Sequence, residues 1–154
     1  MNDIRCVSRL LIMLLSLCAL SAHAEQKKVF DGPEGSEYEL HYIALNSTFL
    51  EPEIARQYQL IRSKAMGLIN ISLIQVFPDG RRKAQTALVQ GRVTNEIQQQ
   101  NVLDFKQVIE GDAVYYLSQL QFAEGKNLRI DLEVYPPGLN EPLVHRFTHA
   151  FFND

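Results

Sequence analysis

Cysteine and tryptophan are the scarcest residue types in this sequence. Its 154 residues include no tryptophan and only two cysteines, Cys6 and Cys18. Both cysteines lie within the first 24 residues, so a chain that loses this segment on export keeps no thiol. The remaining 130 or so residues are enough for a hydrophobic core without disulfides. We therefore expect no disulfide framework, and no cysteine is left to act as a nucleophile.

Extended clusters of basic residues are also missing. Removing Asp3, Arg5 and Arg9 with the first 24 residues leaves 13 basic and 17 acidic residues, a net charge of −4. Basic residues occur only in short groups such as Lys27-Lys28 and Arg81-Arg82. A negative chain without a basic stripe is repelled by phosphate backbones, so we expect no nucleic-acid partner.

The one long apolar run, Leu10 to Leu20, has the features of a signal peptide. Arg5 and Arg9 precede it, and Ala22-His23-Ala24 supplies the small residues that a signal peptidase accepts. A run of eleven residues, all apolar except Ser16, is short against the ~20 that span a bilayer as a helix. The sequence thus predicts a signal peptide over residues 1–24, cleavage after Ala24, a periplasmic protein without stable membrane insertion, and a single domain over 25–154.

Alternation of apolar and polar residues dominates the rest of the chain. Leu128, Ile130 and Leu132, for example, alternate with charged residues, which is typical of a strand with one buried face. Turn residues such as Phe77-Pro78-Asp79-Gly80 separate the runs. We predict about seven strands, near residues 38–45, 65–75, 83–94, 103–109, 114–122, 128–134 and 143–152.

A short helix is expected between the first two of these strands. Pro52 suits the first turn of a helix, and Ile54, Tyr58 and Ile61 follow at helical spacing. No alternating pattern of helices and strands suggests parallel crossovers. The predicted fold is therefore all-β, an antiparallel β-sandwich of immunoglobulin-like type without the usual disulfide and core tryptophan. A single-sheet barrel is the alternative.

Six polar residues flanking this helix form the candidate binding group: Asn46, Ser47, Thr48, Arg62, Ser63 and Lys64. If the strands on either side are antiparallel neighbours, both triplets lie at the same end of the sandwich. Arg62 could then hold a carboxylate of a ligand or partner. Alternatively, Ser47 or Thr48 caps the helix and Arg62 pairs with Glu51 or Glu53, a purely structural role.

The histidines and carboxylates do not form an obvious catalytic set. His145 and His149 share one face of a strand but lie ~13 Å apart at strand rise, too far for one metal ion. His41 could join one of them only by cross-strand pairing. Paired acids such as Glu37 and Glu39 fall where a strand faces solvent. We therefore expect no metal and no cofactor.

Two stretches resemble a family of small exported proteobacterial proteins catalogued only as a domain of unknown function. The stretches are Tyr42-x-Ala44-x-Asn46-Ser47-Thr48-Phe49-Leu50-x-Pro52-x-Ile54 and Arg62-Ser63-Lys64-x-x-Gly67-Leu68-x-Asn70-Ile71-Ser72. The resemblance implies a periplasmic immunoglobulin-like β-sandwich with no assigned activity and no catalytic residue to carry over.

Three functional hypotheses follow. The first is a non-enzymatic periplasmic module that binds a protein partner or supports an assembly of the envelope. The second is a module for small anionic ligands that uses Arg62 and the loop from Asn46 to Thr48. The third is a metal-dependent enzyme built on His41, His145 and His149, which the sequence favours least because it shows no catalytic set.

Overall fold

The computed structural model of the chain describes residues 25–153, so the predicted signal peptide over residues 1–24 lies outside the described part. The described chain folds almost entirely into strands, with one short α-helix. The strands are β1 (Gln26–Asp31), β2 (Glu37–Asn46), β3 (Met66–Val76), β4 (Arg82–Ala84), β5 (Leu88–Thr94), β6 (Gln100–Leu103), β7 (Lys106–Glu110), β8 (Ala113–Gln121), β9 (Asn127–Tyr135) and β10 (Leu143–Ala150).

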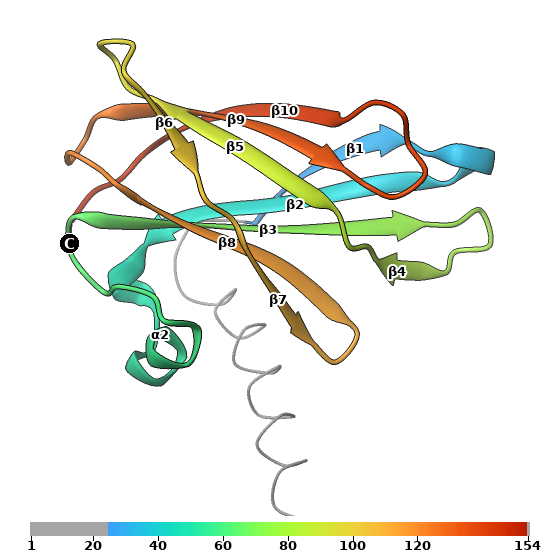
Figure 1. Ribbon diagram of the computed structural model, residues 1–154, viewed down its shortest axis with the longest axis horizontal. Helices are drawn as coiled ribbons and strands as arrows, with labels where there is room; N and C mark the ends of the chain where they lie inside the picture. Colours follow the sequence, from blue (N-terminus) through green and yellow to red (C-terminus); the bar gives the residue numbers. More distant parts are fainter. Residues whose placement is uncertain (1–24, 154) are drawn as a thin grey trace, which may run out of the picture.

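The strands form two antiparallel sheets that pack face to face (Figure 1). Sheet A has the order β1-β2-β3-β8-β7, with β4 paired to the far part of β3. Sheet B has the order β10-β9-β5-β6. The predicted all-β antiparallel sandwich is therefore confirmed, whereas its immunoglobulin-like character stays a prediction.

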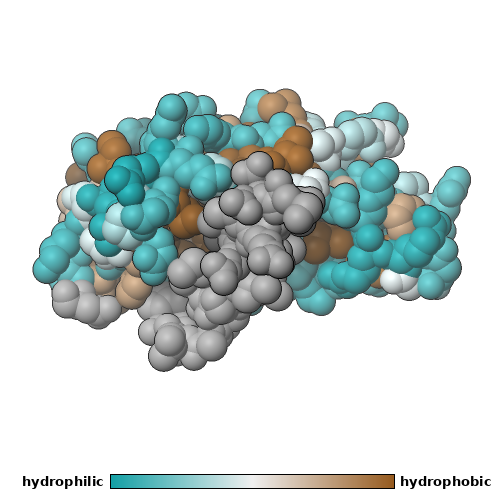
Figure 2. Space-filling view, turned by 90° about the horizontal axis from the view of Figure 1, so that it is seen from below, coloured by the Kyte–Doolittle hydropathy of each residue, from teal (hydrophilic) through white to brown (hydrophobic). Residues whose placement is uncertain are grey.

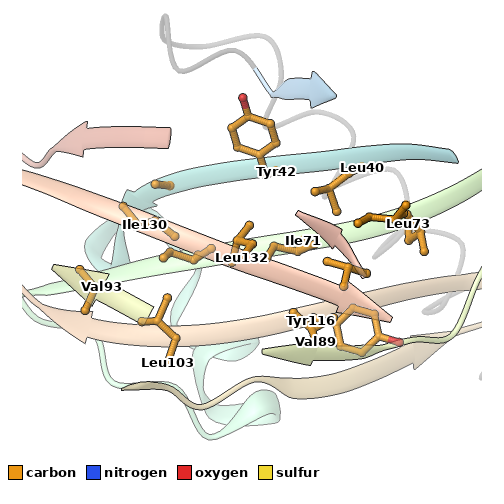
Figure 3. Close-up of a cluster of buried hydrophobic side chains, with 14 of the residues drawn as sticks. Leu40, Tyr42, Ile71, Leu73, Val89, Val93, Leu103, Tyr116, Ile130 and Leu132 are labelled. Atoms are coloured by element: carbon orange, nitrogen blue, oxygen red, sulfur yellow. The ribbon is translucent and has the colours of Figure 1, made fainter. Parts of the chain in front are cut away.

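The core lies between the two sheets and follows the predicted alternation. Leu40 and Leu73 from sheet A face Ile130 and Leu132 from sheet B, and all four side chains are completely buried (Figure 3). Tyr116 belongs to the same core, and its hydroxyl accepts a hydrogen bond of 2.6 Å from the Ala87 N–H. Burial of apolar surface at roughly 25 cal/mol per Å² makes this layer the main source of stability.

Helix α2 (Pro52–Tyr58) covers one end of the outer face of sheet A. Its Ile54 and Ala55 are buried in a second apolar cluster with Leu45 and Leu68 of the sheet. The helix ends at Gln59, whose φ of 57° is left-handed. The predicted helix is confirmed, but Ile61 lies beyond it and is 61% exposed, so Ile61 does not belong to its apolar stripe.

The strand count differs from the prediction, because the structure has ten strands rather than about seven. The expected strand over residues 83–94 is two strands, since the chain leaves sheet A after β4 and enters sheet B at β5. The short strands β1 and β6 account for the other two. The sheet that a strand joins depends on its contacts with other strands. Alternation of apolar and polar residues along the chain does not indicate those contacts.

No helix within residues 25–153 is long and apolar enough to cross a membrane. Viewed from the side that carries α2 and β7 in Figure 1, the described surface is mostly hydrophilic with a few hydrophobic patches (Figure 2).

Candidate functional site

The two predicted polar triplets do come together at one end of the sandwich. Strands β2 and β3 pair antiparallel, with Asn46 at the end of β2 opposite Gly67 near the start of β3. Ser47 begins the 3-10 helix that follows β2, and Ser63 lies three residues before β3. The expected juxtaposition of the triplets is thus confirmed.

Inside this group the buried side chains bind the protein's own backbone. The Ser47 hydroxyl accepts a hydrogen bond from the Ser63 N–H at 2.9 Å and donates one to the Ser63 carbonyl at 3.1 Å. The Asn46 amide donates to the carbonyl of Phe152. Both side chains are buried, and Ser47 completely so. These contacts close the loop between β2 and β3 and fasten the C-terminal segment to it.

Arg62 also forms a hydrogen bond within the group, but not with Glu51 or Glu53, the partners expected if its role were purely structural. Its guanidinium donates to the Thr48 carbonyl at 3.1 Å. Glu53 pairs instead with Arg56 at 2.8 Å, and the helix begins after Glu51 without a side-chain cap. The predicted capping by Ser47 or Thr48 is therefore wrong. The ligand-binding role of Arg62, Lys64 and the loop from Asn46 to Thr48 stays a prediction.

Sequence reasoning missed the one buried carboxylate of the described chain, Glu39 on the outer face of sheet A. It is 6% exposed and accepts hydrogen bonds from Lys27 at 2.8 Å and from Arg82. The hydrogen bond from Arg82 has the largest effect on the pKa of Glu39, and the bond from Lys27 the next largest. Together they lower this pKa to about 2, although burial alone would raise it. The expectation that Glu39 faces solvent is wrong, because β1 and β4 bring basic side chains over it.

The three histidines of the metal hypothesis do not converge. His41 lies on the outer face of sheet A, with Nδ1 3.2 Å from Glu25 and Nε2 3.1 Å from Glu39. His145 and His149 point into the sandwich from β10, because their partners Leu132 and Leu128 are core residues. Residues 25–153 contain no group of three His, Cys, Asp or Glu side chains placed to hold a metal ion. Within these residues, His41, His145 and His149 are therefore not placed to bind one metal ion together.

One long side of the sandwich is closed by the chain itself. Strand β6 is an edge of sheet B and β7 an edge of sheet A, and only Asp104 and Phe105 connect them. Phe105 packs against Gly91 of β5 so closely that a Cβ atom at Gly91 would lie 2.7 Å from its ring. Position 91 therefore has no room for a side chain.

The opposite long side is bounded by two further edge strands, which no loop of residues 25–153 joins directly. These edges are β1 of sheet A and β10 of sheet B, and they run along the same side of the molecule (Figure 1). Aromatic rings fill the gap between the sheets here. The ring centroid of Tyr42 lies 4.5 Å from that of His145 and 4.7 Å from that of Phe147. We call this side the open edge.

His145 is the unusual group of the open edge. Its Nε2 atom is buried and has no hydrogen-bond partner in the described chain. Burial, and to a smaller extent the nearby Lys28 ammonium, lower the pKa of His145 below its usual value of 6.5. Because a neutral imidazole packs against Tyr42 and Phe147, this part of the edge is apolar at neutral pH.

Comparison with known proteins agrees with this architecture. Residues 34–154 match the family described as "Domain of unknown function (DUF4426)". A crystal structure of a DUF4426 family protein from Pseudomonas aeruginosa PAO1 is 27% identical, with a TM-score of 0.67 over 83% of this chain and 96% of that one. No curated protein matches the chain.

Two structures of FetP from uropathogenic Escherichia coli strain F11 share the fold. One is a copper-bound variant of that protein with 15% identity and a TM-score of 0.51, covering 82% of this chain and 97% of FetP. The other is FetP as isolated after recombinant expression in the periplasm, with 13% identity and the same TM-score, covering 85% and 98%. At these identities the likeness shows the fold alone.

Proposed function

The chain belongs to the DUF4426 family, and we propose that this member is a non-enzymatic periplasmic accessory protein that binds an extended segment of an envelope protein along β10. Export is supported by the charged start, the apolar run and the Ala-x-Ala cleavage pattern before Glu25. The fold shared with FetP, a protein that has been expressed in the periplasm, agrees with that location.

The observation that carries the proposal is the unpaired edge of β10. An edge strand exposes a row of backbone N–H and C=O groups, and proteins normally shorten, charge or cover such edges. Of the other edge strands in residues 25–153, β4, β6 and β7 have three, four and five residues, and β1 has six that include Lys27 and Lys28. Strand β10 has eight residues without proline, and is the edge best suited to take an added strand.

The side chains of β10 would give such an added strand its specificity. Val144, Arg146 and Thr148 lie on the outer face of sheet B, where Val144 is 60% exposed. His145 and Phe147 lie on the inner face and are half-buried because the edge is open. A bound segment with alternating apolar residues would extend sheet B and cover these two rings.

A photo-crosslinking amino acid at position 144 tests the proposal in cells that export the protein. We expect one dominant crosslinked envelope protein from Val144→Bpa, where Bpa is p-benzoylphenylalanine. Ile109→Bpa on the opposite side is the matched control, since Ile109 is 62% exposed and lies on the shorter edge strand β7. Equal yields at both positions, or no product at position 144, would contradict the proposal.

A further inference from the structure

The β5–β6 hairpin and the β8–β9 turn lie at the same end of the sandwich (Figure 1). Residues of both line a pocket there, away from the middle of the open edge. Its volume is about 320 Å³. It is lined by Val93, Asn95, Glu96, Ile97, Gln99, Asn101, Gln121, Phe122, Ala123, Lys126 and Leu128. Four of these eleven side chains are amides, and we call the site the amide pocket.

The wall formed by the β5–β6 hairpin is held in one conformation by Asn95. Its Oδ1 accepts hydrogen bonds from the N–H groups of Ile97 at 3.1 Å and Gln99 at 2.9 Å. Its amide nitrogen donates to the Gln99 side chain at 2.9 Å. Gln98 between them takes a left-handed φ of 64° to complete the turn. A wall fixed before a ligand arrives loses little conformational entropy on binding.

The second wall is tied to the first by Glu96. Its carboxylate accepts a hydrogen bond from the Asn127 N–H at 3.1 Å and lies 3.7 Å from the Lys126 ammonium. The charges of Glu96 and Lys126, the acidic and the basic residue of the pocket, therefore neutralise each other. A charged ligand would have to compete with this pair, so the pocket favours an uncharged one.

The floor and the free polar groups complete the recognition surface. Val93 and Leu128 are buried beneath the pocket, and the Phe122 ring stacks on Phe151 with centroids 4.7 Å apart. Above this floor, Asn101 and Gln121 are exposed and make no side-chain hydrogen bond within residues 25–153. Each amide offers two donors and an acceptor in one small group.

We propose that the amide pocket binds one or two rings of an uncharged saccharide. The hydroxyls of a sugar ring both donate and accept hydrogen bonds. Uncharged amide side chains can accept from such hydroxyls and donate to them. The C–H face of the sugar ring suits an apolar floor that includes an aromatic residue. A volume of about 320 Å³ lies at the lower end of the range for small-molecule sites. This site is separate from the β10 edge, so the test of saccharide binding does not depend on whether β10 binds a partner.

Titration of the ¹⁵N-labelled chain over residues 25–154 with tri-N-acetylchitotriose and with maltotriose tests the site. We expect at least one of the two to shift the backbone amides of residues 95–101 and 121–128 in a saturable way. Gln121→Ala and Asn101→Ala should each weaken the saccharide at least fivefold. Gln90→Ala, an exposed amide on the outer face of sheet B, is the matched control and should leave the affinity unchanged.

Gln121→Glu keeps the size of the side chain but removes its donors, and should weaken binding like the alanine variant while the protein stays folded. The proposal is overturned if neither saccharide shifts these amides. It is equally overturned if the shifts lie elsewhere, or if Gln121→Ala and Asn101→Ala bind as tightly as Gln90→Ala.

Discussion

Gly67 of β3 lies directly against the ring of Phe151, and a Cβ atom at Gly67 would come within 2.6 Å of the Cζ atom of that ring. Phe151 is 1% exposed and belongs to the main core. One residue further along the chain, the Phe152 carbonyl accepts the hydrogen bond from Asn46. Two residues of the stretches that resemble the family, Gly67 and Asn46, thus hold the C-terminal segment against sheet A.

Gly67→Ala should therefore destabilise the fold. The added methyl group has no room beside a buried ring, and overpacking of this kind typically costs 1–3 kcal/mol, so we expect a loss of about 2 kcal/mol. Urea unfolding followed by circular dichroism measures it. Adding Phe151→Leu shortens the opposing side chain, and the double variant should lose less than the sum of the two single losses. Strict additivity of the two changes would contradict this packing contact.

Ser47→Ala should cost about 1–3 kcal/mol of unfolding free energy, because the N–H and C=O of half-buried Ser63 lose their hydrogen-bond partner, the fully buried Ser47 hydroxyl. Thr48→Ala removes a neighbouring hydroxyl that is exposed, and should change stability by less than about 0.5 kcal/mol. Thermal and urea unfolding of the pair give the comparison. Similar losses in both variants would mean that the Ser47 bonds contribute little.

Glu39→Gln should remove a pH-dependent part of the stability. The folded pKa of Glu39, about 2, is below the usual 4.5, so its ion pairs stabilise the fold above pH 4.5 and are lost as the pH falls towards 2. The lowered pKa corresponds to about 3 kcal/mol of unfolding free energy at neutral pH. We expect about 1–3 kcal/mol, because Lys27 and Arg82 are half exposed and solvent screens their ion pairs with Glu39. The two unfolding curves should converge between pH 4.5 and 2.

The neighbouring acid provides the control for that comparison. Glu37 lies two residues away on the same face of β2 and is exposed. Glu37→Gln should change the unfolding free energy at pH 7 much less than Glu39→Gln does, because exposed Glu37 makes no ion pair within residues 25–153. If Glu39→Gln behaves like Glu37→Gln at pH 7, the ion pairs with Lys27 and Arg82 do not stabilise the protein.

His145 should make the protein less stable in mild acid. Its folded pKa is lowered, so the unfolded chain binds the proton more tightly, and stability falls as the pH drops below about 6.5. His145→Phe keeps a ring beside Tyr42 and Phe147 and removes a buried nitrogen without a partner. The variant should lose less stability than the parent between pH 7.5 and 5.5. An NMR titration that places the His145 pKa above 6.5 would refute this reasoning.

Alternation and turn chemistry predicted the parts of the fold whose causes are local. The core positions of β9, the helix beginning at Pro52 and the turn ending at Gly80 all follow from neighbours in sequence. The division between β4 and β5 does not, because it depends on long-range bonds such as that from the Gln85 N–H to the Leu73 carbonyl at 2.8 Å.

For the polar side chains, too, the sequence predicted contacts between consecutive strands but not contacts between distant ones. Spacing placed the triplets around Asn46 and Arg62 at one end, and this was right because β2 and β3 are adjacent in sequence and pair. Burial of Glu39 could not be predicted, since its cationic partners lie 12 and 43 residues away and come from two other strands. The unpaired edge of β10 depends likewise on the order of strands in sheet B, which no local pattern specifies.

The position of crosslinks along the bound partner tests strand addition at β10 most directly. Photo-crosslinkers placed singly at Val144, Arg146 and Thr148 project from the same face of the strand, two residues apart. Mass spectrometry of the crosslinked peptides should place all three products in one partner segment, at positions that shift by two residues from one crosslinker to the next. Products scattered over unrelated segments, or in no fixed register, would contradict the account.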